Sequence, residues 1–296
     1  MGRRPGGRAG LTPGDRGSVA APDPTPLEAP VPTDRTPLLL IHGAWLSSES
    51  WETFAGFFAS KGYDVTAPEW PRKQMGAAAQ RESSDDIADL GVEEIVDHYA
   101  AIVEAMDAPP VIMGHSFGGL FTELLLDRGL GRAGVGLSPA APKGVMRLPF
   151  SQLKSAAPAL AHPSKRHGVV PLDLDEFTYA FVNTWPADAA KDAYERYCVP
   201  ETGRIFYEAG FANLRLHAPT EVDYHREGRA PMLLVGAEQD HTVPASVVRS
   251  QHKKYDGGPS PVEYVEFAGR PHLSMTGDGW EEIATHIAGW LERNGA

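Results

Sequence analysis

The sequence contains very little cysteine, no long apolar run and no excess of positive charge. Its single cysteine, Cys198, excludes a disulfide within this sequence and a cysteine-rich metal site. No stretch approaches the roughly 18 to 20 apolar residues that cross a bilayer, and no apolar segment of a secretion signal follows the first arginines. The net charge of −12 opposes binding to nucleic acid. We therefore expect a cytoplasmic protein with no membrane or nucleic-acid partner.

The first 36 residues have the composition of a disordered tail. Residues 1–36 contain seven prolines and six glycines but almost no large apolar side chains. Such a segment cannot bury enough surface to offset the conformational entropy that is lost on ordering. We predict that the folded part begins at Pro37, and the 42% of hydrophobic residues in the chain suffice for a sizeable core.

From Pro37 on, short apolar runs alternate with segments of helical periodicity, which is typical of a parallel sheet with crossover helices. The predicted strands are 37–41, 63–68, 111–113, 133–137, 232–236 and 262–267. The helices expected between and after them are one capped by Ser50, a long one from Ile87 to Met106, and those at 117–128, 245–255 and 280–293. The alternation stops in 142–229, where three segments have helical periodicity: 150–160, 174–185 and 187–197. We predict an α/β core of residues 37–141 and 230–296 with an inserted helical cap, 142–229.

The most informative motif is the pentapeptide G-H-S-F-G at positions 114–118. It lies between a predicted strand and a predicted helix, which is the context of a nucleophile elbow of the form G-x-S-x-G. In such a turn the serine adopts a strained backbone conformation, and its glycine neighbours avoid steric clashes. The helix start also points N–H groups at the position where negative charge develops. We predict that Ser116 is a nucleophile, and the alternative is a glycine-rich turn without a catalytic task.

A serine nucleophile needs a base, and the base needs a carboxylate that orients it. Asp240 follows the fifth predicted strand and His272 follows the sixth, so both can reach the edge of the sheet that carries Ser116. We predict His272 as the general base and Asp240 as its acid. Glu238, two residues nearer the strand, is the competing acid. Three other histidines are less suitably placed: His241, His252 and His286.

The loop after the first strand, I-H-G-A-W at 41–45, is expected to complete an oxyanion hole. A tetrahedral intermediate needs two N–H donors directed at its oxyanion. We predict that one donor is the backbone of Phe117 and that the other is Ala44, with Trp45 as the alternative. His42 is expected to hold the loop by hydrogen bonds, and a direct role in catalysis is the alternative.

The H-G-A-W loop, the G-H-S-F-G elbow and the Asp240–His272 pair, in that order, resemble the α/β-hydrolase superfamily over about residues 36–294. Within it, the loop and the helical cap look like the small esterase, lactonase and hydroxynitrile-lyase-like branch. The resemblance implies a cofactor-free enzyme with a pocket between core and cap. Serine at the elbow separates the chain from haloalkane dehalogenases and epoxide hydrolases, which resemble it but use an aspartate.

These features predict a serine hydrolase that cleaves a carboxylester, lactone or thioester of a small to medium, mainly apolar molecule through an acyl-enzyme on Ser116. No metal is required. Candidate substrate contacts are His42, Trp45, Tyr179 and Trp185, with Phe117, Phe177, Phe181 and Tyr197 as further aromatic candidates, although an aromatic set at helical spacing is more often core. Two alternatives remain: a lyase or cyclase in which His272 is the base, and a ligand-binding receptor that retains the triad.

Overall fold

A computed structural model describes residues 1–2 and 35–296, and residues 35–296 form one compact unit. Apart from its ends, the tail predicted at 1–36 lies outside the described residues. Within the described ranges, no helix is long and apolar enough to span a bilayer.

A six-stranded sheet forms the centre of this unit, and all of its neighbouring strands run parallel. The strands in spatial order are β2 (Asp64–Thr66), β1 (Pro37–Ile41), β3 (Val111–His115), β4 (Ala133–Leu137), β7 (Met232–Ala237) and β8 (Val262–Phe267). The central strands β1, β3 and β4 are almost fully buried, which explains why their sequences are continuous apolar or small-residue runs. The predicted parallel α/β sheet is therefore confirmed.

The order of the strands reverses at β1, because β2 lies on one side of it and β3 on the other. The carboxyl ends of β1 and β3 are paired here, with Ile41 opposite Gly114. In open α/β sheets, ligands bind in the crevice outside the carboxyl ends of the strands at such a switch point. The fold thus places the loop after Ile41 and the turn after His115 side by side.

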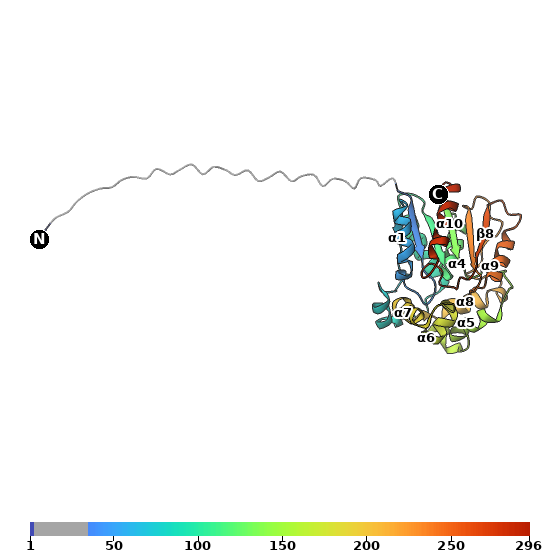
Figure 1. Cartoon of the computed structure of the whole chain (residues 1–296), viewed down its shortest axis with the longest axis horizontal. Coiled ribbons are helices and arrows are strands. Elements are labelled where there is room, and N and C mark those ends of the chain that lie inside the picture. The colour runs from blue at the N-terminus through green and yellow to red at the C-terminus, as the bar shows by residue number, and fades with distance from the viewer. Residues whose placement is uncertain (3–34) are drawn as a thin grey trace. The chain divides into compact units, whose positions relative to one another are not determined.

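Crossover helices cover the sheet, and Figure 1 shows α1, α4, α9 and α10 around its strands. The core helices are α1 (Glu52–Ser60), α3 (Val92–Glu104), α4 (Phe117–Asp127), α9 (Ala245–His252) and α10 (Trp280–Arg293), with the short α2 (Ala77–Glu82) before α3. The α1 and α10 helices pack through aromatic contacts of Trp280 with Phe54 and Phe57. The α3 and α10 helices each bury one apolar face, whereas α4 is buried on nearly all sides.

The segment 142–229, which we call the insertion, connects β4 to β7. Its four helices lie together below the core in Figure 1. They are α5 (Phe150–Leu160), α6 (Leu174–Phe181), α7 (Ala187–Tyr197) and α8 (Arg204–Gly210). The bounds of α5 and α7 agree with the predicted periodicity. The short α8 and the antiparallel pair β5 (Val169–Val170) and β6 (Glu201–Thr202) were not predicted, because two-residue strands leave no pattern in a sequence.

Two expected helix starts are wrong. Ser50 does not cap a helix, because it lies in a 3₁₀ turn, Ser48–Trp51, and its hydroxyl donates to the carbonyl of Ser47. The helix expected from Ile87 begins only at Val92, since Gly91 before it has an extended backbone and Ile87 closes a separate 3₁₀ turn. The side chains of Ile87 and Leu90 are buried although they lie outside the helix. Their apolar character therefore extended the helical pattern of the sequence beyond the true start of α3.

Candidate active site

Ser116 occupies a strained turn between β3 and α4. Its backbone has φ 55° and ψ −118°, a region that a residue with a side chain rarely adopts. Such a conformation costs on the order of 1 to 3 kcal/mol and persists only where surrounding structure enforces it. Here the Ser116 N–H donates to Leu137 O at 2.9 Å, and the Ser116 carbonyl accepts from Leu120 and Ala140. The turn therefore holds Ser116 at the carboxyl edge of the sheet.

Two glycines make this turn possible. A Cβ atom on Gly114 would lie 2.0 Å from Gly118 O, and one on Gly118 would lie 2.1 Å from Ile41 O. Both contacts are with backbone, which cannot move aside without displacing the sheet. The G-x-S-x-G spacing is thus a steric requirement of the close approach of β3, α4 and the end of β1.

His272 and Asp240 form a buried pair in the loops after β8 and β7. The Nδ1–H of His272 donates to Asp240 Oδ2 at 2.7 Å. The other oxygen, Asp240 Oδ1, accepts from the backbone N–H groups of Thr242 and Val243, each at 2.7 Å. These bonds fix the orientation of the carboxylate and the tautomer of the neutral ring, which leaves Nε2 unprotonated. His272 Nε2 is buried and has no hydrogen-bond partner in the described part of the chain.

His115, the neighbour of Ser116, ties the His272 loop to the elbow. Its Nε2–H donates to the backbone carbonyl of His272 at 2.9 Å, and the two ring centroids are 4.5 Å apart. Burial lowers the pKa of His115 well below 6.5, and the charge of His272 lowers it further. His115 is therefore neutral and serves as a fixed donor. On the other side, the ring of Phe181 in α6 lies 5.2 Å from the His272 ring.

The competing acid and the other histidines lie elsewhere. Glu238 is exposed and accepts from the N–H of Gly269 at 2.8 Å rather than from a histidine. The ring of His241 contacts Tyr179, while His252 bonds the carbonyl of Val262. His286 lies within α10 and packs on Phe267. Of the carboxylates considered from the sequence, only Asp240 contacts His272.

The loop after β1 brings backbone donors to the elbow. A Cβ on Gly43 would lie 2.9 Å from Ser116 Cβ, so this loop runs directly against Ser116. Within the described residues, the N–H groups of Ala44 and Phe117 have no acceptor. The N–H of Trp45 is already used, because it donates to Glu201 Oε2 at 3.2 Å. The backbone N–H groups of Ala44 and Phe117 are therefore free to donate to a group bound beside Ser116.

A buried ion pair holds this loop against the insertion, and the sequence did not predict it. Lys73 Nζ donates to Glu201 Oε2 at 2.8 Å and to the carbonyl of Leu46 at 3.0 Å. Glu201 also accepts from the N–H of Trp45, whose φ of 61° is unusual for a residue with a large side chain. The pair thus fixes the two residues that follow Ala44.

His42 is buried beneath the same loop. Its ring stacks on Trp70 with centroids 5.0 Å apart, and its Nε2 lies 3.0 Å from Glu69 Oε2. Burial raises the pKa of Glu69, but hydrogen bonds from His42 and Ser48 outweigh it and lower the pKa to about 2. The Nδ1 of His42 contacts the carbonyl of Gly43. These contacts are those of a histidine that positions the loop.

The predicted substrate contacts separate into buried and half-buried groups. Trp45 is only 2% exposed and packs on Phe206 of α8, which also contacts Phe117. Tyr179 is half-buried and lines a cavity of about 460 Å³ between α5 and α6. Trp185 is half-buried and packs on Gly277, in the loop that follows His272. Aromatic side chains thus surround the site from both the core and the insertion.

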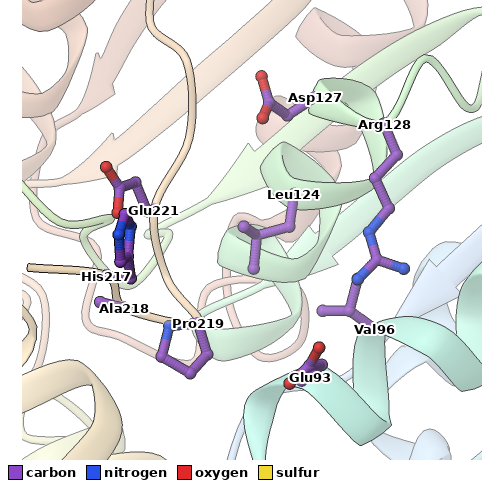
Figure 2. A pocket seen from close by; sticks show the side chains of 9 residues that line it. All are labelled: Glu93, Val96, Leu124, Asp127, Arg128, His217, Ala218, Pro219 and Glu221. Carbon is purple, nitrogen blue, oxygen red and sulfur yellow. The ribbon is translucent and has the colours of Figure 1, made fainter.

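A second cavity, of about 410 Å³, lies at the far end of α4 (Figure 2). Leu124 and Asp127 of the last turn of α4, with Arg128 directly after it, face Pro219 and His217 across this cavity. Neither of the two cavities is lined by Ser116, Asp240 or His272.

A family profile described as "Alpha/beta hydrolase family" matches residues 38–286. The chain belongs to the alpha/beta hydrolase family. The hydrolase is 37% identical over 93 residues to the non-heme chloroperoxidase of Burkholderia pyrrocinia, a match that spans 30% of each chain.

Solved structures share the fold of this hydrolase. The monoacylglycerol lipase of Paleococcus ferrophilus is similar with a TM-score of 0.61 and 21% identity, over 87% of this chain and 94% of the other. Polyneuridine aldehyde esterase is similar with a TM-score of 0.63 and 17% identity, over 86% and 99%. At these identities the likeness concerns the fold alone. Among the described residues of the hydrolase, no group of three or more His, Cys, Asp or Glu is arranged to hold a metal.

Proposed function

We propose that this hydrolase cleaves an ester-like bond of a mainly apolar substrate through an acyl-enzyme on Ser116. The observation that carries the proposal is the buried pair of His272 and Asp240, in which Nδ1 is bonded to the carboxylate and Nε2 is left without a partner. His115, the residue before Ser116, donates to the backbone carbonyl of His272. This bond holds the loop that carries His272 against the turn that carries Ser116. A base, its orienting acid and a serine in a strained elbow are the parts that acyl transfer requires.

The reaction would proceed in two balanced halves. His272 Nε2 takes the proton of the Ser116 hydroxyl as the oxygen attacks the substrate carbonyl, and the imidazolium is stabilised by Asp240. The tetrahedral intermediate collapses when His272 gives that proton to the leaving alcohol, which leaves an acyl-enzyme. Water then attacks the acyl carbonyl as His272 takes one of its protons, and the proton returns to Ser116 when the acid leaves.

The backbone N–H groups of Ala44 and Phe117 are the proposed oxyanion donors. Both are free of acceptors within the described residues, and the Phe117 N–H lies at the start of α4, where the helix dipole favours negative charge. Such donors act on charge that develops only in the transition state, so they raise kcat rather than ground-state affinity.

The walls of the site support an apolar substrate. Phe117 packs on Phe206, and the ring of Phe181 lies 5.2 Å from the ring of His272, so apolar side chains from α4, α6 and α8 border the site. Burying an apolar acyl or alcohol group here gains about 25 cal/mol for each Å² removed from water. We therefore place carboxylesters of small to medium acyl chains first among the candidate substrates, ahead of lactones and thioesters.

The test is hydrolysis of p-nitrophenyl esters from acetate to octanoate by the full chain and by Ser116→Ala. We expect turnover by the wild type, with a preference for longer acyl chains up to the length that the site accommodates, and loss of turnover in the variant. Ser260→Ala is the matched control, because this serine is also buried but bonds Arg226 in a remote loop. Turnover retained by folded Ser116→Ala would refute the serine mechanism.

A lyase or cyclase is the second candidate, because His272 Nε2 accepts no hydrogen bond from Ser116 in the structure. In that chemistry His272 would remove a proton from the substrate directly, and Ser116 would only position it. Activity on a non-ester substrate that survives Ser116→Ala but not His272→Ala would identify this case.

A further inference from the structure

Large apolar side chains are exposed in one region of the insertion. We call this region the apolar patch, and its members are Met146, Leu148, Phe150, Leu153, Phe211, Leu214 and Leu216. Phe150 is 79% exposed and Leu216 is 84% exposed. The other large hydrophobic side chains exposed in the described part of the chain are Met1 and Met75. Exposed apolar surface is therefore concentrated rather than scattered, and such concentration marks an interaction site.

The two segments that carry the patch are tied together. Lys143 Nζ donates to the carbonyl of Leu216 at 2.6 Å. The side chain of Asn213 accepts from the N–H of Gly144 at 2.6 Å and donates to the carbonyl of Val145 at 3.0 Å. The α5 and α8 helices also pack against each other. The loop before α5 and the turn after α8 thus form one surface.

The outward face of α5 continues this surface. Phe150, Leu153 and Ala157 recur at helical spacing and are all exposed, whereas Ser155 and Ala159 on the opposite face are buried. Helices of globular proteins normally present polar side chains to water. The apolar face of α5 is consequently without a partner among the described residues.

Most charges next to the patch are positive, although Lys143 pairs with Glu221 and Lys154 lines the same cavity as Asp175 and Glu176. Residues 143–170 contain five Lys and Arg and no acid, and residues 209–220 contain Arg215 and no acid, in a chain whose net charge is −12. Within the described residues, Arg147, Lys154 and Arg215 pair with no carboxylate, although Lys154 also lies over the ring of Tyr179. A basic, apolar surface on an acidic protein is complementary to an anionic partner.

We propose that the apolar patch binds an anionic lipid surface. Apolar side chains that enter the boundary between headgroups and acyl chains, flanked by Lys and Arg that attract anionic lipids, are the features of interfacial binding. The patch side chains project outward and line neither of the cavities described above, so they suit a deformable lipid surface better than a shaped protein partner. We expected no membrane partner, because the sequence has no apolar run long enough to cross a bilayer. That criterion concerns spanning a bilayer and does not apply to binding at its surface.

The patch adjoins the candidate active site through α5. The hydroxyl of Ser155 in this helix donates to the carbonyl of His241, the residue after Asp240, at 3.2 Å. If the proposed ester hydrolysis holds, a lipid surface on the patch would deliver esters dissolved in it close to Ser116. The binding itself does not depend on the reaction.

The test is co-sedimentation of the full chain, carrying Ser116→Ala to prevent turnover, with vesicles of phosphatidylglycerol and phosphatidylcholine in equal parts. We expect binding to these vesicles, weaker binding at high salt, and little binding to phosphatidylcholine alone. Phe150→Ser with Leu214→Ser should weaken binding about tenfold or more, and so should Arg147→Gln with Arg215→Gln.

Met75→Ser is the matched control, since Met75 is 76% exposed but lies outside the patch, and it should bind vesicles like the parent protein. Equal binding by the patch variants and the parent, or no binding of the parent to anionic vesicles, would overturn the proposal. The protein could instead form a concentration-dependent dimer that the patch variants abolish, and fail to bind vesicles. That result would overturn the proposal and would mean that the patch binds a second copy of the chain. Because vesicle binding is measured without turnover, its failure is distinguishable from failure of the proposed esterase activity.

Discussion

Lys73 and Glu201 form an ion pair in which both side chains are fully buried, with Nζ and Oε2 2.8 Å apart. The pair joins the loop after β1 to the insertion, because Glu201 accepts from the N–H of Trp45 and Lys73 donates to the carbonyl of Leu46. Two charges are costly to bury, and a pair of this kind contributes to a specific geometry more than to net stability. Here that geometry is the position of Ala44, the proposed oxyanion donor.

We expect Glu201→Gln to lower kcat more than it changes KM. The amide keeps the shape of the side chain but leaves the Lys73 ammonium buried without a counter-charge, which costs on the order of 3 to 5 kcal/mol. Urea unfolding measures that cost, and ester hydrolysis by the folded fraction measures the displacement of the loop. Glu195→Gln removes a partner from the exposed Lys191–Glu195 pair and should change the free energy of unfolding by about 1 kcal/mol or less. Equal effects of the two variants would contradict the positioning role.

The raised pKa of Glu123 predicts that the free energy of unfolding falls as the pH rises towards neutrality. Burial among α4, α9 and the following turn raises its pKa from 4.5 to about 7, although Gln251 and Tyr255 donate hydrogen bonds to it. Since the pKa is higher in the folded state, the stabilisation is fully present below pH 4.5 and is lost as the pH rises to about 7. The loss amounts to about 3 kcal/mol. Urea unfolding from pH 5 to pH 8 should show this slope in the wild type and lack it in Glu123→Gln, and an identical slope in both would contradict the assignment.

The lowered pKa of Glu69 predicts that the free energy of unfolding falls as the pH decreases into the acid range. Its pKa in the folded state is about 2, below the ordinary 4.5, so its stabilisation is present above pH 4.5 and is lost as the pH falls to about 2. The difference corresponds to about 3 kcal/mol. Glu69→Gln should therefore unfold with a weaker dependence on pH between 4.5 and 2 than the wild type. Acid unfolding of both proteins can be followed by circular dichroism. If the variant and the wild type unfolded with the same pH dependence between 4.5 and 2, Glu69 would not hold His42 as described.

Asp240→Asn tests the orientation of the base. The amide oxygen can still accept from Thr242 and Val243, so the NH₂ group would face His272 Nδ1 and favour the tautomer with the proton on Nε2. That tautomer cannot take the proton of Ser116, and we expect kcat to fall by about 10³- to 10⁴-fold with little loss of stability. Glu238→Gln, in the same loop but exposed, should keep wild-type kinetics. If the two variants lost activity equally, the assignment of the acid would be wrong.

The fold could be predicted where one segment determines its own structure. The bounds of β1, β4, β8 and α10 follow from apolar runs and helical periodicity, and the elbow around Ser116 could be recognised from the G-x-S-x-G spacing of five consecutive residues. Asp240 and His272 could be selected because each follows a strand whose carboxyl end meets the same edge of the sheet.

Contacts between distant segments left no such signal. Lys73 and Glu201 are 128 positions apart, and the bond from His115 to the His272 carbonyl spans 157 positions and uses a backbone atom that every residue possesses. The late start of α3 was missed for a different reason, since Ile87 and Leu90 are buried outside the helix and extend its apolar pattern. The contacts between the insertion and the core that position the loop after β1 form only in the folded protein. The periodicity of each segment alone does not predict them.

The most direct measurement is the site of covalent labelling by an alkyl fluorophosphonate, a reagent that phosphonylates an activated serine and cannot be released as an acyl group can. We predict one adduct per chain in the intact mass, located on Ser116 by peptide mapping, absent from Ser116→Ala and formed far more slowly in His272→Ala. Labelling of another residue, or an unlabelled Ser116 in a preparation that hydrolyses esters, would contradict the assignment of Ser116 as the nucleophile.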